Sequence, residues 1–522
     1  MKFGLAQPNT PAWRIWPAWL RLLVRVIGER SLGLGLIAGV LLLLIAYQSP
    51  RAILVDIGGP LDNLHAVGFH DSETSGDANF RWSTAKGSLV FQGIGKPLSA
   101  FPVTLQLSSG RGQGSDLLPV QISVNGHELA PLSLGPESAA YVVTVDPAWI
   151  DLSGDLRIDF QSSTFKSGND KRDLGFLADF ARADLPVGAT LPALPVLLWL
   201  LVCGFLLYLL VRSFWVVPRL AGWITIAFFV LCAAGIGVQR LLVTIFTDRL
   251  AYTLLLAIVV TTLAEWLALY ATRLAGWRGD HAVPEWAWTG LRVLVALSVV
   301  LKVGGLLYPH TFIIDAEFHL KYVTYMYEGR DFDTYFGKSL ALSVMPPDEW
   351  GSARAFIPYS PFFYVVASPL AYLPLPLSIT VPVASGIFES MKIALVFLAA
   401  LALGTARRGD SPQGSSRIAL IAAVVYAWIP ANFLLQQFGN WPTLTSHWLL
   451  TLWAAITCLF WPRITKPLIW LISTIALTLT MLSYTVTAAY VGIFVGLLVV
   501  LGWLFAPAER KRWASLALSA VA

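Results

Sequence analysis

The sequence contains few cysteines and few charged residues. Only 3 of its 522 residues are cysteine, and all three lie inside apolar runs, which excludes a disulfide framework and a cysteine-ligated metal site. Charged residues make up 13% of the chain, against about a quarter in an ordinary soluble domain. Because 56% of the residues are hydrophobic, a soluble enzyme is also excluded.

The charge balance indicates topology and gives no sign of a nucleic-acid partner. The 36 basic residues only slightly outnumber the 31 acidic residues, and the basic residues gather in short segments between apolar runs. Such clusters stay in the cytoplasm under the positive-inside rule. We therefore expect no nucleic-acid partner and an integral protein of the cytoplasmic (plasma) membrane.

The first apolar run, about residues 31–48, follows a basic leader. A signal peptide is the alternative to a retained anchor, but residues 47–50 lack the small-x-small spacing of a cleavage site. We therefore predict a membrane anchor whose N-terminal side is cytoplasmic, so that the chain after it is extracytoplasmic.

Residues 51–186 differ in composition and predict an inserted domain. Glycine, serine, aspartate and asparagine are frequent, and apolar and polar residues alternate in short runs such as 120–124 and 141–145. With turn signals such as Asn125-Gly126, this pattern indicates an extracytoplasmic antiparallel β-sandwich. Further strands are expected at 80–83, 89–91, 103–107, 156–160 and 174–180.

The strand pattern of this domain resembles the jelly-roll carbohydrate-binding modules. That resemblance makes Trp82, Trp149 and Tyr141 candidates for stacking on sugar rings. Core packing is the other reading of these aromatics, and we favour it because apolar rings are the usual filling of a small β domain.

The remaining apolar runs predict a polytopic α-helical membrane protein with about 10 or 11 spanning helices. The run at 359–376 contains several prolines, which remove backbone hydrogen bonds that lipid cannot replace, so it is expected to re-enter the membrane without spanning it. We divide the chain into an anchor at 1–50, the β-sandwich at 51–186, three spanning helices at 187–285 and a membrane module at 286–522 with an outer loop at 309–357. After the anchor, the expected spans are 190–211, 219–238, 250–270, 286–308, 380–404, 417–437, 443–461, 467–483 and 485–506.

Chemically able side chains gather in the outer loop, in the segment Asp315-Ala316-Glu317-Phe318-His319. Asp315 and His319 are four residues apart and would share a helix face, as a base with its orienting partner or as two ligands of a divalent metal. A structural explanation is also open, in which Asp315 caps a surface helix and Glu317 pairs with Lys321.

The order of features resembles the GT-C superfamily of membrane glycosyltransferases, which use polyprenyl-phosphate-linked sugars. The matching features are the helix at 286–308, the acidic segment at 315–319 and a Tyr-x-Pro segment that includes Tyr359. Over about residues 286–506, the resemblance implies hexosyl or pentosyl transfer to an extracytoplasmic glycan, lipid or protein acceptor. It makes Asp315 the catalytic base, Glu317 its acidic companion and His319 an acceptor-positioning group or ligand.

The sequence departs from that family in the next outer loop, at 435–443, which has no carboxylate. A metal site, for Mg²⁺ or Mn²⁺ at Asp315 and Glu317, is therefore expected only if transfer is metal dependent. Gln436, Asn440 and His447 can hydrogen-bond a sugar, although capping and interfacial anchoring explain them equally simply.

The lipid phosphate needs a cationic partner. Arg354 is the first candidate, because a guanidinium group grips phosphate with two hydrogen bonds, and Lys321 and Arg330 are the alternates.

Charged residues also occur within the predicted spans. Lys302, Glu389 and Lys392 are expected to face one outer cavity, or else to reach the interface and pair among themselves, while Glu265 has no evident partner. A non-enzymatic glycan-sensing or scaffold protein is the alternative function for the whole chain.

Overall fold

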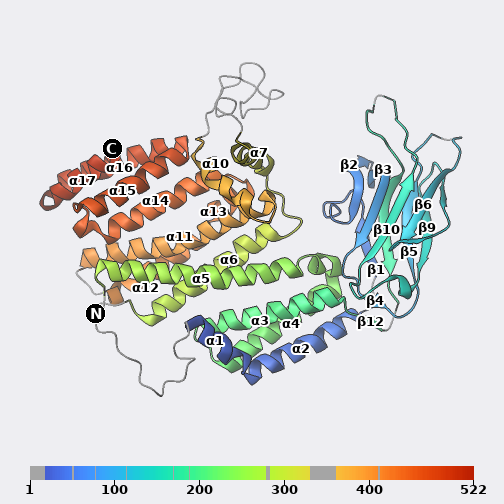
Figure 1. Ribbon diagram of the computed structural model, residues 1–522, viewed down its shortest axis with the longest axis horizontal. Coiled ribbons are helices and arrows are strands. Elements are labelled where there is room, and N and C mark those ends of the chain that lie inside the picture. Colours follow the sequence, from blue (N-terminus) through green and yellow to red (C-terminus); the bar gives the residue numbers. More distant parts are fainter. Residues whose placement is uncertain are drawn as a thin grey trace. The chain divides into compact units, whose positions relative to one another are not determined.

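The chain folds into two compact units. The computed structural model describes residues 18–49, 52–76, 78–112, 114–168, 170–186, 189–277, 283–329, 360–408 and 412–521. Unit 1 comprises Met1–Leu254 with Tyr308–His310, and unit 2 comprises Leu255–Leu307 with Thr311–Ala522 (Figure 1). The two units are described separately below.

Unit 1 contains a helical part whose packing depends on small residues. Its helices are α1 (Ala18–Ile27), α2 (Arg30–Tyr47), α3 (Leu194–Ser213), α4 (Pro218–Thr244) and the start of α5 (Thr247–Ala275). The fully buried ring of Phe229 on α4 lies against Gly39 of α2 and Gly204 of α3. A methyl group at either glycine would lie 2.6 or 2.5 Å from the ring, respectively, so α2, α3 and α4 approach closely only because these positions lack a side chain.

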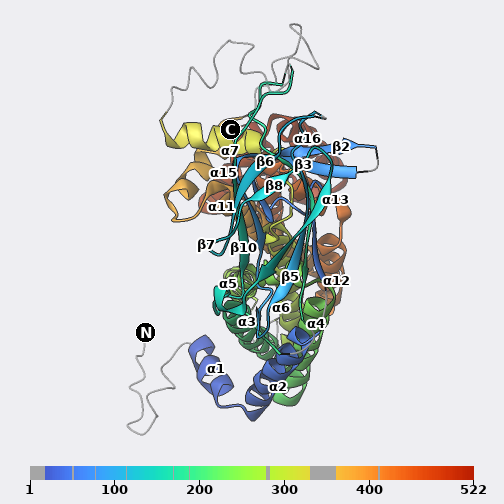
Figure 2. The same ribbon diagram turned by 90° about the vertical axis from the view of Figure 1, so that its right-hand side faces the viewer.

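The β domain of unit 1 is antiparallel, as predicted. Ten strands form one hydrogen-bonded sheet and two short strands form another (Figure 1, Figure 2). The strands are β1 (Ala52–Asp56), β2 (Ala66–Ser75), β3 (Ala78–Phe91), β4 (Lys96–Pro97), β5 (Phe101–Ser108), β6 (Leu118–Val124), β7 (His127–Glu128), β8 (Leu132–Leu134), β9 (Ala139–Val145), β10 (Leu156–Ser162), β11 (Leu177–Asp184) and β12 (Thr190–Leu191).

The sheet is continuous because of β3. The two strands expected at 80–83 and 89–91 are parts of this single 14-residue strand. Its C-terminal half pairs with β10, and Arg81 and Trp82 near its start pair with β11. Alternating burial along β5, β6 and β10 fills a core of aliphatic and aromatic side chains. The predicted Asn125-Gly126 turn joins β6 to β7, with φ of 45° and 84° at its two residues.

One loop of the β domain is bound by the ends of the unit 1 helices. The Tyr47 hydroxyl donates to the Gly93 carbonyl at 2.9 Å, Thr244 Oγ1 donates to the Gln92 carbonyl at 2.7 Å, and Arg240 Nη1 donates to the Ile94 carbonyl at 2.7 Å. Side chains from α2 and α4 thus satisfy three consecutive carbonyl groups, which fixes the base of the β domain on its helices.

Unit 2 is helical throughout its described residues. Helix α11 packs against α6, α12 and α14, and α7 contacts α10 and the short helix η5. The helices are α6 (Glu285–Leu307), α7 (Ala316–Tyr327), α10 (Phe362–Ala367), η5 (Ser368–Tyr372), α11 (Leu377–Arg408), α12 (Pro412–Ala427), α13 (Pro430–Gln437), α14 (Trp441–Leu459), η6 (Trp461–Arg463), α15 (Pro467–Ser483), α16 (Thr485–Phe505), η7 (Pro507–Glu509) and α17 (Arg510–Val521).

Eight helical segments among the described residues are long and apolar enough to cross a membrane, fewer than the 10 or 11 expected. The expected spans at 443–461 and 467–483 are helices α14 and α15, which fall outside this set by composition and length. The run expected to re-enter forms only the short helices α10 and η5, of six and five residues. The eight segments are Arg30–Tyr47, Leu194–Ser213, Pro218–Thr244, Thr247–Ala275, Glu285–Leu307, Leu377–Ala406, Gly414–Gln437 and Thr485–Phe505.

The close packing of α2 on α4 can be tested at two glycines of the same helix. Gly39→Val would drive a side chain into the Phe229 ring and should cost about 1–3 kcal/mol of stability. Gly33→Val is the matched control, because a Cβ there meets no atom within 4 Å. Thermal unfolding of the purified protein should show a lower Tm for the first variant only, and equal Tm values would contradict this packing.

Candidate functional site

The loop before α7 is fixed by backbone contacts with the turn between α13 and α14. The amides of Ile314 and Asp315 donate to the carbonyls of Gln437 and Phe438 at 3.2 and 3.0 Å. Gly439 has φ of +73°, and a Cβ at this position would lie 2.8 Å from Cγ2 of Ile313. The turn can approach the loop this closely only with glycine, and the approach fixes the backbone of Asp315.

The two carboxylates of the predicted motif are not used for local structure within the described chain. Asp315 occupies the N-cap position of α7, yet its side chain makes no capping hydrogen bond. Glu317 and Lys321 are exposed and form no ion pair with each other or with another described residue. Neither structural role that the spacing allowed is therefore filled in the described part of the chain.

The electrostatics of Asp315 suit a base. Partial desolvation raises the pKa of its carboxyl group above the ordinary value of 3.8. A carboxylate with a higher pKa holds an abstracted proton more strongly.

His319 lies below the exposed carboxylates, in an aromatic cluster. Its side chain is only 2% exposed, and Nδ1 shares a hydrogen bond of 2.9 Å with the Tyr364 hydroxyl. The rings of Trp441 and Phe363 lie 5.8 and 6.3 Å from the imidazole. Burial lowers the pKa of His319 from 6.5 to about 4, so the imidazole is neutral at pH 7.

The structure brings some of the other predicted residues to this site. Gln436 is buried as the second-to-last residue of α13, and its Nε2 has no hydrogen-bond partner among the described residues. Asn440 occupies the N-cap position of α14 without a side-chain capping bond, and its Oδ1 accepts a hydrogen bond from Thr443 Oγ1 at 2.7 Å. His447 is half-buried on α14.

Other predicted residues make no contact that supports a role. The Lys321 ammonium lies 5.8 Å from the Tyr325 ring. Arg330, Arg354 and Tyr359 lie outside the described residues, so their predicted roles stay predictions.

The intramembrane charges of unit 2 form one buried cluster. The Lys302 ammonium lies 3.6 Å from Glu389 Oε2, and Lys392 forms an ion pair with the other oxygen of the same carboxylate. All three side chains are at most 1% exposed. The Lys302 ammonium also lies 5.1 Å from the ring of Phe433 on α13. Two lysines thus share one carboxylate inside the helical unit.

Glu265, for which the sequence offered no partner, pairs with Arg292. Glu265 Oε1 lies 3.5 Å from Arg292 Nη1, and Arg292 Nη2 also contacts Glu285 at 2.7 Å. The partner is 27 positions away on the next helix, which is why local spacing did not reveal it.

The aromatic residues considered for sugar stacking are used inside the β domain. Trp82 packs edge-on against Phe165 at 5.8 Å, and Trp149 stacks on His127 at 5.4 Å. The Tyr141 hydroxyl donates to the Ser133 carbonyl at 3.2 Å. These contacts agree with the core-packing alternative.

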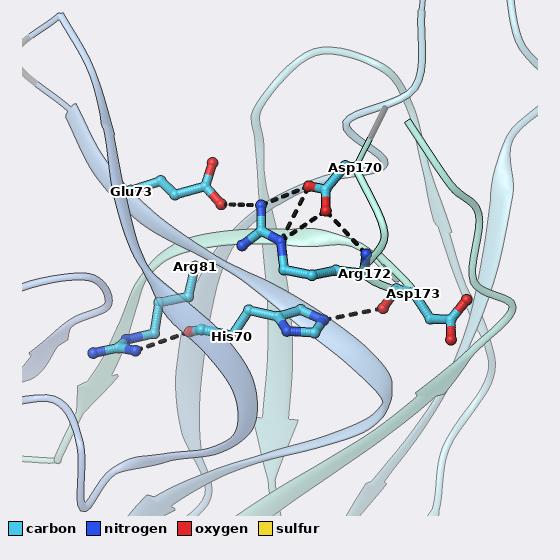
Figure 3. Close-up of polar contacts among 6 residues, drawn as sticks. All are labelled: His70, Glu73, Arg81, Asp170, Arg172 and Asp173. Carbon is cyan, nitrogen blue, oxygen red and sulfur yellow. Dashed lines mark hydrogen bonds and ion pairs between the residues drawn. The ribbon is translucent and has the colours of Figure 1, made fainter. Parts of the chain in front are cut away.

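A polar network joins the β2–β3 hairpin to the loop before β11 (Figure 3). Arg172 contacts Glu73 at 2.6 Å and Asp170 at 2.7 Å, and Arg81 Nη1 donates to the His70 carbonyl at 2.8 Å. The Arg172 guanidinium lowers the pKa of Asp170 to about 2. The network adds side-chain contacts between the hairpin and the loop before β11, whose Gly175 amide also donates to the Ser83 carbonyl of β3 at 2.8 Å.

The described residues do not assemble a metal site. No group of three or more His, Cys, Asp or Glu side chains able to hold an ion occurs among them. Asp315 and Glu317 are two neighbouring carboxylates, and a Mg²⁺ ion held by them would take its remaining oxygen ligands from water or a substrate phosphate.

Comparisons with known proteins give one structural match. No protein-family model and no curated protein matches the chain. A family 35 carbohydrate-binding module from Clostridium thermocellum matches at 14% identity and a TM-score of 0.16, over 26% of this chain and 92% of the module. A match at this level assigns no ligand to the chain.

The contact between His319 and Tyr364 can be tested by removing the hydroxyl. Tyr364→Phe leaves a buried imidazole nitrogen without that partner and should lower the free energy of unfolding by about 1–3 kcal/mol. Tyr372→Phe is the control, because Tyr372 is 78% exposed. Thermal unfolding should separate the two variants, and indistinguishable Tm values would show that the hydrogen bond contributes nothing.

The depressed pKa of His319 predicts a stability that falls in acid. Between pH 6.5 and about 4 the unfolded chain binds a proton at this residue that the folded chain excludes. Stability should therefore decrease as the pH falls through this window, and His319 should contribute no pH dependence above it. The loss in Tm between pH 7 and pH 5 should be smaller in His319→Gln than in the wild type, and an equal loss would contradict the buried neutral imidazole.

Proposed function

We propose that this chain is a membrane glycosyltransferase that moves a sugar from a polyprenyl-phosphate carrier to an extracytoplasmic acceptor, with Asp315 as the base. In this proposal the N-terminus is cytoplasmic, the β domain and the loop at 309–357 are extracytoplasmic, and α14 and α15 span the membrane together with the eight longer apolar segments. The acceptor is a glycan, a lipid or a protein.

The observation that supports the proposal most is the state of the Asp315 carboxylate. It stands at the start of α7 without a capping hydrogen bond, on a backbone that the Gly439 turn fixes. Glu317 beside it is likewise unpaired among the described residues. Carboxylates that stabilise neither helix nor fold, yet are held in one place, are what general base catalysis requires.

The proposed reaction is an inverting displacement. Asp315 takes the proton of an acceptor hydroxyl, whose oxygen forms a bond to the anomeric carbon as the bond from that carbon to the carrier phosphate breaks. The carrier phosphate leaves with the electron pair, and it is a good leaving group, so little beyond a base and an anion site is needed. Glu317 assists through its charge, and His319 supports the floor of the site through Tyr364.

Cations near the site would bind the carrier phosphate. Arg354, Lys321 and Arg330 remain the candidates from the sequence. The Lys302, Glu389 and Lys392 cluster has more lysines than carboxylates, and its Lys302 ammonium lies 5.1 Å from the ring of Phe433 on α13, the helix whose end holds Asp315. No step of the proposed reaction is assigned to a metal ion.

The proposal is tested by sugar transfer with purified protein in nanodiscs and a panel of polyprenyl-phosphate sugars. Asp315→Asn keeps the shape of the side chain but removes its basicity, so turnover should fall by about 10²–10⁴-fold while lipid-sugar binding is retained. Glu317→Gln should have a smaller effect, because a charge is lost and the base remains. A chelator series on the wild type tests metal dependence in the same assay.

The matched control is Glu328→Gln, at the opposite end of α7. It should turn over like the wild type. Equal turnover in Asp315→Asn and Glu328→Gln would remove Asp315 from the mechanism. Absence of both turnover and lipid-sugar binding across the panel would favour the non-enzymatic glycan sensor or scaffold.

A further inference from the structure

A cavity of about 410 Å³ lies in unit 1, between the β domain and the last turns of α4. Strand β1, the loop from Gly59 to Asp62 and His65 form one wall, and Ile236–Leu242 of α4 forms the other. Ligand sites of small molecules have volumes of about 300–1,000 Å³, so this cavity can hold a compact polar group. Because α4 is a candidate span and its end carries the β domain, the cavity belongs to the edge of the membrane.

The wall formed by α4 is irregular. Gln239 has φ of −140° and ψ of 66°, which is not helical, within a helix that is otherwise continuous from Pro218 to Thr244. Interruptions of this kind occur in membrane helices where the backbone lines a polar cavity instead of lipid. Gln239 and Arg240, at this kink, are the polar residues that α4 contributes to the wall of the cavity.

Arg240, next to the kink, is a buried cation without a carboxylate partner. Arg240 is 6% exposed, and it forms no ion pair with any described residue. Its guanidinium donates to the carbonyls of Ile94 and Tyr47 at 2.7 and 3.5 Å and lies 4.6 Å from the Tyr47 ring. Carbonyl groups use only part of its five donors and none of its charge, so an anion is the missing partner.

The acidic residues of the cavity do not fill that role. The Asp62 carboxylate binds other groups. It accepts two hydrogen bonds from Arg81, at 2.6 and 2.8 Å, and one from the Gly58 amide at 2.6 Å. Asp56 is exposed, and its carboxylate lies 3.3 Å from the Asn79 amide nitrogen. Asp56 can accept hydrogen bonds from hydroxyl or amine groups of a ligand whose anionic part is at Arg240.

The residues around the cavity include exposed aliphatic side chains. Leu54, Leu61 and Val238 are 57%, 44% and 60% exposed and all three line the cavity. Val238 is on the candidate span α4, whereas Leu54 is on β1 and Leu61 is in the loop after β1, so the apolar edge of the cavity includes side chains of both the helix and the β domain. The cavity thus combines one unpaired guanidinium, hydrogen-bond acceptors and an apolar edge.

We propose that this cavity binds the headgroup of a glycerophospholipid, with its phosphate on Arg240, its terminal hydroxyl or amine groups toward Asp56 and its acyl chains along Leu54, Leu61 and Val238. The bound lipid links the β domain to the membrane. This inference is independent of the proposed transferase activity, because none of these residues belongs to the Asp315 site.

Native mass spectrometry of the full-length protein in detergent tests the inference, with dioleoylphosphatidylglycerol as the probe. Dioleoylglycerol carries the same acyl chains without phosphate, and inorganic phosphate carries the anion without chains. We expect a lipid adduct with phosphatidylglycerol, at least tenfold weaker adducts with the other two, and at least a tenfold loss of phosphatidylglycerol affinity in Arg240→Gln. Arg219→Gln, at the exposed start of the same helix, should bind like the wild type.

A second variant protects the test against loss of folding in Arg240→Gln. Val238→Trp fills the edge of the cavity without removing a hydrogen-bonding side chain, and it should also lose the lipid. Val230→Trp, at another exposed position of α4, should retain it. The proposal would be overturned if Arg240→Gln and Val238→Trp both bind phosphatidylglycerol as tightly as the wild type does. Binding of dioleoylglycerol or free phosphate as tight as that of the phospholipid would overturn it as well.

Discussion

Lipid offers no hydrogen-bond partner, so each polar group in a spanning helix must find its partner within the protein. This constraint explains where the charges of the chain lie. Glu389 holds two lysines, Arg292 holds Glu265, and Arg212 holds Glu29 at 2.8 Å. Removing one member of such a pair would leave a buried charge uncompensated, which is costly. Charges within the spans thus connect helices that are distant in sequence, and they stabilise the helical units on which the functional loops stand.

Charged groups that lack an ion-pair partner among the described residues are candidates for binding or catalysis. The Asp315 and Glu317 carboxylates have no partner among the described residues, although a fixed backbone carries them. Arg240 has carbonyl partners but no anion. A carboxylate without a partner can abstract a proton, and a guanidinium without a counter-ion can bind a phosphate group. The two sites therefore differ in chemistry as well as in place.

Local patterns in the sequence predicted local structure well. Alternation at 120–124 and Asn125-Gly126 predicted β6 and its turn, and the apolar runs predicted most of the long helices within a few residues. Strand β3 was predicted as two strands, because polar residues such as Lys86 interrupt its apolar pattern while the backbone continues. For the site, the sequence pointed to Asp315, Glu317 and His319 and, in the next outer loop, to Gln436, Asn440 and His447. Tyr364, Trp441 and Gly439 were missed, since their contacts with residues 313–319 span 45 or more positions and leave no local spacing.

The central claim is that Asp315 meets the acceptor hydroxyl during sugar transfer. A cryo-electron microscopy structure of the protein in a nanodisc, with a non-transferable polyprenyl-phosphonate sugar and an acceptor, tests it most directly. The account predicts the acceptor hydroxyl within hydrogen-bond reach of the Asp315 carboxylate, about 2.6–3.2 Å, and the anomeric carbon about 3–3.5 Å from that hydroxyl. Donor and acceptor bound together at a place where another side chain contacts the hydroxyl would contradict it.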